Sequence, residues 1–114
     1  MSSEPVISIS GKVHYLSRIG LSPNTTLYVS LLDVTLADAP AKELAQQVIE
    51  NAETTGLNFT LTCRPADTVP GHDYAISARI THNDRLIFAT AKHHPVFLDV
   101  ANLQPQEVLV SPIG

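Results

Sequence analysis

The feature that most constrains the fold of this chain is a two-residue alternation of apolar and polar side chains, which recurs along most of its length. The alternation is clearest in residues 6–16, whose apolar face carries Ile7, Ile9, Val13 and Tyr15. A period of two with β-branched residues predicts a strand that buries one face. Gly11 falls on the same face, and we expect either a bulge or the close approach of another backbone there.

Similar patterns predict further strands at residues 26–36, 57–63, 74–81, 86–90, 95–98 and 107–110. Asn83 and Asp84 separate two of these segments. Both residue types tolerate positive φ, so they predict a two-residue hairpin turn. Residues 42–51 fit both a helical stripe and a strand, and we expect a strand because strands surround them.

The apolar positions within residues 26–36 change parity. They begin at Leu27, Val29 and Leu31 and continue at Leu32, Val34 and Leu36. A slip of one residue turns every later side chain of a strand to the opposite face. We therefore predict a β-bulge near Leu31 and Leu32, which leaves Asp33 pointing away from the core.

About seven short strands separated by turn residues predict an all-β fold, an antiparallel β-sandwich. The chain of 114 residues fits a single domain, residues 1–114, with an ordered core over about residues 6–111. The residues expected in the core are Ile7, Ile9, Val13, Leu27, Val29, Leu31, Val34, Phe59, Leu61, Ile76, Ile80, Leu86, Phe88 and Val108.

Charge and composition argue against several classes of partner. The chain has 7 Lys and Arg against 11 Asp and Glu, a net charge of −4, so it lacks the basic patch that nucleic acids require. No apolar run reaches the length of a transmembrane helix, about 20 residues. Cys63 is the single cysteine and ends an alternating strand on its apolar face, which favours a small core residue over a nucleophile.

Two acidic residues in the stretch "DVTLADAPAK" (residues 33–42) are candidates for a catalytic pair. A general acid and base need one carboxyl in an apolar pocket and the other in solvent, and nothing local sets the separation of Asp33 and Asp38. We expect one of them to bind the backbone amides of a turn instead.

The histidines are candidates for a metal site. His93 and His94 are adjacent, and neighbouring residues of a strand point to opposite faces. Only one of them could therefore join His14, His72 or His82 on a metal. Because no histidine or acid repeats at ligand spacing, we predict no native metal site and no cofactor.

Two blocks of the sequence are similar to a known family. Residues 21–47, "LSPNTTLYVSLLDVTLADAPAKELAQQ", contain a loop with Leu and Pro, a strand that ends in Asp33 and Val34, and Ala-Asp-Ala-Pro at residues 37–40. The second block contains Tyr74, Ala78, Arg79, Ile80, Leu86, Phe88, Thr90, Pro95 and Val96. These blocks resemble the bacterial YbaY/YscW family of YbaY-like lipoproteins and small lipoprotein pilotins, the secretin chaperones of type III secretion. The resemblance extends over about residues 9–110.

The resemblance implies a β-sandwich without catalytic activity and a role in the bacterial envelope. It implies a periplasmic or outer-membrane lipoprotein. Residues 1–6, "MSSEPV", have no features of a secretory signal, so a cytoplasmic location is expected if this chain is the complete gene product. The implied partner is a secretin-like or other envelope protein, or a lipid.

We expect a partner or ligand to contact Phe88, His93, His94, Pro95 and Phe97. A partner strand could pair with an edge formed by residues 92–99, or an apolar group could enter a slot lined by Phe88 and Phe97. Two other hypotheses remain: a metal-dependent or hydrolytic enzyme that uses His93, His94 and Asp38, and a purely structural domain.

Overall fold

A computed structural model describes residues 6–16, 20–36, 40–91, 94–98 and 105–113. The strands are β1 (Ile7–Tyr15), β2 (Thr25–Asp33), β3 (Lys42–Ile49), β4 (Asn58–Cys63), β5 (Tyr74–His82), β6 (Arg85–Ala89), β7 (His94–Val96) and β8 (Gln106–Pro112). Two short helical turns, α1 (Ala52–Thr55) and the 3-10 turn η1 (Pro65–Asp67), lie before and after β4. The region that fitted both helix and strand is therefore a strand, β3, as expected.

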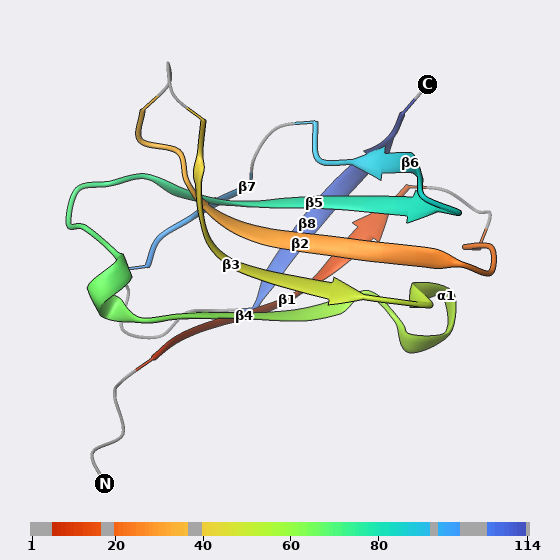
Figure 1. Cartoon of the computed structure of the whole chain (residues 1–114), viewed down its shortest axis with the longest axis horizontal. Coiled ribbons are helices and arrows are strands. Elements are labelled where there is room, and N and C mark those ends of the chain that lie inside the picture. Colours follow the sequence, from red (N-terminus) through yellow and green to blue (C-terminus); the bar gives the residue numbers. More distant parts are fainter. Residues whose placement is uncertain (1–5, 17–19, 37–39, 92–93, 99–104, 114) are drawn as a thin grey trace, which may run out of the picture.

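The strands form one mixed, nearly closed, barrel-like sheet in the order β3-β2-β5-β6-β8-β1-β4, with β7 paired to β5. β8 pairs with β6 on one side and in parallel with β1 on the other (Figure 1). It therefore joins the two layers of the sheet, one formed by β1 and β4 and the other by β2, β3, β5, β6 and β7. The sheet ends β3 and β4 meet at a seam, where Gln47 Oε1 accepts a hydrogen bond of 2.6 Å from the Thr60 N–H. An all-β fold is confirmed, whereas a purely antiparallel sandwich is wrong, because alternation within strands carries no information about where the last strand is inserted.

The alternating residues form the interior of the barrel. Of the fourteen residues expected in the core, ten are buried: Ile9, Val13, Leu27, Val29, Leu31, Phe59, Leu61, Ile76, Ile80 and Val108. Ile7 and Phe88 are partly buried against them, and Val34 is half-buried. Leu86 is 41% exposed, so its assignment to the core was wrong. The β5–β6 register shifts between Ile80 and Thr81, which pairs Leu86 with Thr81 and turns it outward.

The predicted bulge lies at the expected place but in the partner strand. The β2–β3 register shifts between Leu31 and Leu32, and the extra residue is Leu44 of β3, since Leu31 pairs with Ala45 and Leu32 with Glu43. β2 itself runs against β5 without interruption as far as Asp33, which pairs with Tyr74. Asp33 therefore keeps the parity of Leu31 and lies on the core side of β2, at the end of the barrel, and not on the outer side as expected.

Two local predictions about backbone conformation are confirmed. Asn83 and Asp84 form the turn between β5 and β6 with φ of 50° and 65°. Gly11 pairs with Phe59 of β4 on one side and with Gln106 of β8 on the other. A Cβ at this position would lie 2.2 Å from the Gln106 carbonyl oxygen, so the backbone of β8 approaches closely here. In the part of the chain that the structure describes, no helix is long and apolar enough to span a membrane.

Candidate functional site

An open groove of about 630 Å³ lies at the end of the barrel where β2 leaves the sheet. One wall is the β4–β5 loop, residues 68–73, and the opposite wall is residues 95–98, in and after β7. Tyr74, Ala75 and Val34 complete the lining. A concave, largely apolar surface with a few polar groups is typical of a binding site.

The wall of residues 95–98 carries most of the apolar side chains of the groove, and the loop wall adds Val69 and Pro70. Phe97, which is 70% exposed, and Val69 of the loop wall, which is 48% exposed, both line the groove. Val96 and Tyr74 are buried beneath them and pair with one another across β7 and β5. Large apolar side chains at the rim of a groove lose contact with water when a partner covers them, which is favourable.

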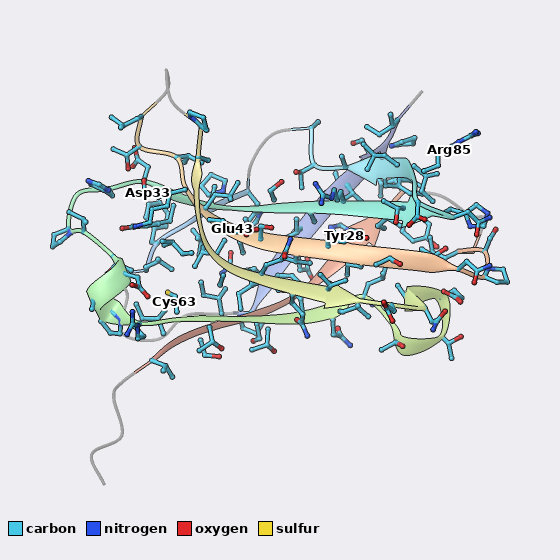
Figure 2. The ribbon with its side chains drawn as sticks, in the orientation of Figure 1. Tyr28, Asp33, Glu43, Cys63 and Arg85 are labelled. Carbon is cyan, nitrogen blue, oxygen red and sulfur yellow. The ribbon has the colours of Figure 1, made fainter. Side chains whose placement is uncertain are left out.

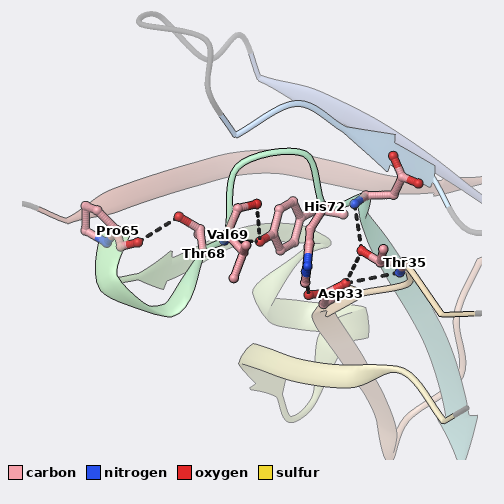
Figure 3. A network of polar contacts seen from close by, with 8 residues as sticks. Asp33, Thr35, Pro65, Thr68, Val69 and His72 are labelled. Atoms are coloured by element: carbon pink, nitrogen blue, oxygen red, sulfur yellow. Dashed lines mark hydrogen bonds and ion pairs between the residues drawn. The ribbon is translucent and has the colours of Figure 1, made fainter.

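A polar network fixes the base of the loop to the end of β2 (Figure 3). The Thr35 N–H and the Thr35 hydroxyl both donate to Asp33 Oδ1, at 3.0 and 2.6 Å. The other oxygen, Asp33 Oδ2, lies 2.7 Å from His72 Nδ1. The Asp73 N–H donates to Thr35 Oγ1 at 2.9 Å, and the Val34 N–H donates to the Asp73 carbonyl at 2.9 Å.

The hydrogen bonds to Asp33 stabilise its ionised form. They lower the pKa of this carboxyl from 3.8 to about 2, the Thr35 side chain contributing most and His72 next. Asp33 is therefore an anion throughout the neutral range. The expectation that this residue binds turn groups is confirmed, since it accepts the amide of Thr35 two residues further on. The same expectation for Asp38 lies outside the described residues.

Tyr74 supports the opposite end of the loop. The Val69 N–H donates to the Tyr74 hydroxyl oxygen at 2.7 Å, while the Tyr74 ring is buried at the start of β5. Thr68 donates its hydroxyl to the Pro65 carbonyl at 2.7 Å and so closes the η1 turn. The loop is thus attached at both ends, by Tyr74 and by Asp33.

The residues expected to contact a partner lie in different places. Pro95 and Phe97 line the groove. His94 is in β7, and its Nε2 lies 2.8 Å from Gln106 Oε1. Phe88 is not among the residues that line this groove, and its ring packs against Tyr15 with centroids 5.1 Å apart. Contact of a ligand with Phe88 stays a prediction. His93 lies outside the described residues.

The other candidates from the sequence are dispersed over the fold. Figure 2 shows Cys63 at the same end of the barrel as Asp33; it is buried, and burial raises the pKa of its thiol. Among the described residues, no three His, Cys, Asp or Glu side chains gather as metal ligands would. On the outer face of the sheet, the Arg79 guanidinium lies 4.7 Å from the centre of the Tyr28 ring.

Sequence reasoning found one wall of the groove and missed the other. The loop wall, residues 68–73, contains Pro70 and Gly71, which indicate a loop but no binding role. His72 was weighed only as a metal ligand, although it comes directly after these turn residues. No local pattern could bring it to Asp33, which lies 39 residues earlier.

Comparisons with known proteins give a consistent relationship. The model of a family described as type III secretion system lipoprotein chaperone (YscW) matches residues 4–108. The chain is 39% identical over 90 residues to an uncharacterized lipoprotein, YbaY, of Escherichia coli strain K12, which covers 78% of this chain and 47% of that protein. The chain thus spans about half the length of this relative. A solved structure of an alternative pilotin from the type II secretion system of Vibrio cholerae has a TM-score of 0.85 and 33% identity, over 96% of this chain and 99% of that one.

Proposed function

The chain belongs to the YscW family of type III secretion system lipoprotein chaperones, as its sequence blocks indicated, and on this premise we propose that it is a non-enzymatic, pilotin-like chaperone of the bacterial envelope. In this proposal it binds an apolar segment of a secretin-like partner in the groove between Phe97 and the loop of residues 68–73. The groove is the observation that carries the proposal.

The exposure of Phe97 supports a role in binding. A phenylalanine side chain that is 70% exposed beside Val96 and Val69 leaves apolar surface in water. Covering such a side chain with a partner is worth roughly 1–3 kcal/mol. The groove volume of about 630 Å³ suits several apolar side chains of one peptide segment, since pockets of about 300–1,000 Å³ bury most of a small ligand.

A partner strand paired to β7 is the alternative mode, and Pro95 argues against it. β7 pairs with β5 through Val96 to Tyr74, Pro95 to Ala75 and His94 to Ile76. Because proline has no N–H, the pair of Pro95 and Ala75 must be the one without ladder hydrogen bonds. The backbone N–H and C=O groups of His94 and Val96 therefore point toward β5. At its centre, the outer edge of β7 then has the Pro95 carbonyl as an acceptor but no N–H donor. Such an edge hinders pairing with another strand.

The enzymatic hypothesis has less support. Of its three residues, His94 is described, and its Nε2 contacts a glutamine side chain, Gln106. His93 and Asp38 lie outside the described residues. The family description as lipoprotein chaperones and the lipoprotein relative support a place at the envelope, in the periplasm or at the outer membrane.

The test is a titration of candidate partners into wild type and Phe97→Ala. The candidates are a peptide of the C-terminal tail of the secretin encoded in the same genome, and phospholipid vesicles. We expect Phe97→Ala to weaken the peptide by about 5- to 150-fold, which corresponds to about 1–3 kcal/mol. Leu109→Ala is the matched control, because Leu109 is 43% exposed on β8 and is not among the groove residues.

The outcomes separate the hypotheses. Equal peptide binding by folded Phe97→Ala and wild type would refute the groove as the binding site. Binding of vesicles but not of the peptide would favour a lipid ligand. If wild type binds neither, the chaperone proposal fails and a purely structural domain becomes the better hypothesis.

A further inference from the structure

We propose that Asp33 is the positioning residue of the groove: its carboxylate holds the loop wall, residues 68–73, in the conformation that receives a partner. The proposal rests on the proposed function for the identity of the partner. Its structural part concerns the loop alone and can be tested without any partner.

The loop wall has little apolar surface to hold it in place. From Arg64 to Asp73 no residue is buried, and Val69 and Pro70 are exposed. Segments with few buried apolar contacts open at low free energy, so their conformation depends on individual hydrogen bonds. In this loop those bonds connect to three points: the Tyr74 hydroxyl, the Val34 N–H, which donates to the Asp73 carbonyl, and the network around Asp33.

Asp33 is the centre of that network because both of its oxygens are used. Oδ1 accepts the hydroxyl proton of Thr35, and this orients a lone pair of Thr35 Oγ1 toward the Asp73 N–H. Oδ2 faces His72 Nδ1 at 2.7 Å. A carboxylate only accepts hydrogen bonds, so it can serve two donors at once. Without Asp33, the Thr35 hydroxyl has no fixed orientation and His72 loses its contact.

The network lies at the groove without forming its apolar surface. Asp33 and Thr35 are not among the lining residues, whereas His72 and Asp73, which they hold, are. Asp33 itself is fixed by regular β pairing to Tyr74 of β5 and Lys42 of β3. The sheet thus fixes the Asp33 side chain, which holds His72 directly and the Asp73 N–H through Thr35.

Two measurements on the full chain test the proposal, with Asp33→Ala as the disrupting variant and Asp33→Asn as the conservative one. Amide hydrogen exchange followed by NMR should be about tenfold or more faster at Asp73 in Asp33→Ala, since the Thr35 hydroxyl that accepts the Asp73 N–H then loses the carboxylate that orients it. Exchange at Val29, in the middle of β2, should stay unchanged. Asp33→Asn retains an acceptor for Thr35 and should restore part of the protection. Asp67→Ala is the matched control, because Asp67 lies in the adjacent η1 turn and, among the described residues, its carboxylate accepts hydrogen bonds from Arg64 and from no residue of the loop wall.

The second measurement is the affinity for the secretin tail peptide. We expect Asp33→Ala to weaken it severalfold although Asp33 does not line the groove, and Asp67→Ala to leave it unchanged. Unchanged exchange at Asp73 in Asp33→Ala would overturn the positioning role, as would faster exchange at Val29 to the same extent, which would mean general destabilisation. Faster exchange at Asp73 with unaltered peptide affinity would overturn the link to binding. If wild type does not bind the peptide, the proposed function fails, and the exchange data alone decide whether Asp33 holds the loop.

Discussion

Replacing Gly11 with alanine tests the closest backbone contact in the barrel. The added Cβ would lie 2.2 Å from the Gln106 carbonyl oxygen, 2.7 Å from Cζ of Phe59 and 2.9 Å from the Gln106 carbonyl carbon. Ordinary contacts of a Cβ begin at about 3.4 Å, so β8 or β1 must move by about 1 Å. Gly11 and Gln106 form the first pair of the only parallel ladder between the described strands, and this ladder joins the two layers.

The magnitude follows from the kind of atom that must move. A flexible side chain such as Phe59 can rotate, but a backbone carbonyl within a ladder cannot, so we expect the upper end of the overpacking range, about 3 kcal/mol. The gain from removing a strand glycine, about 0.5–1 kcal/mol, offsets part of this. The net loss of about 2 kcal/mol should lower the melting temperature by roughly 8 °C in a domain of this size.

The assay is thermal and urea unfolding followed by circular dichroism. Gly20→Ala is the matched control, since a Cβ there meets nothing within 4 Å, and it should change the free energy of unfolding by less than about 0.5 kcal/mol. A Gly11→Ala protein that melts within about 2 °C of wild type would refute the reasoning that β8 packs directly on this glycine.

Three further predictions follow from single contacts. The pKa of Asp33 is lowered in the folded state, so the stabilisation of the fold by its carboxylate is complete above about pH 4 and is lost as pH falls toward 2. In urea unfolding, the difference in free energy of unfolding between wild type and Asp33→Asn should therefore shrink by about 1 kcal/mol over this range. A constant difference would contradict the assignment. Leu61→Ala should cost about 2–5 kcal/mol because Leu61 is 1% exposed in the barrel interior, and a loss below about 1 kcal/mol would show that the site collapses around the smaller side chain. Asp84→Gly should raise the free energy of unfolding by about 0.5–1 kcal/mol, because φ is 65° there and glycine adopts it without strain; a lower melting temperature would count against the turn geometry.

The sequence by itself determined the strands and the residues that point inward. Apolar alternation is a local property of an extended chain, so it predicts which side chains share a face, as Ile9 and Val13 of β1 or Leu27 and Val29 of β2 do. The turn at Asn83 and Asp84 and the close approach at Gly11 were also predictable, because both depend on the conformational preferences of single residues. One wall of the candidate site contains Pro95 and Phe97, which the sequence indicated as contacts of a partner or ligand.

Tertiary structure alone decided how the strands close and what meets at the groove. The bulge opposite Leu31 could belong to either strand, and only the pairing register assigns it to Leu44 of β3 and so places Asp33 on the core side. The insertion of β8 between β6 and β1 makes a barrel-like sheet from segments that alternation alone would equally allow as a sandwich. His72 reaches Asp33 across 39 residues because β2 and β5 are antiparallel neighbours. Such contacts depend on the order and register of strands, which one strand's pattern does not contain.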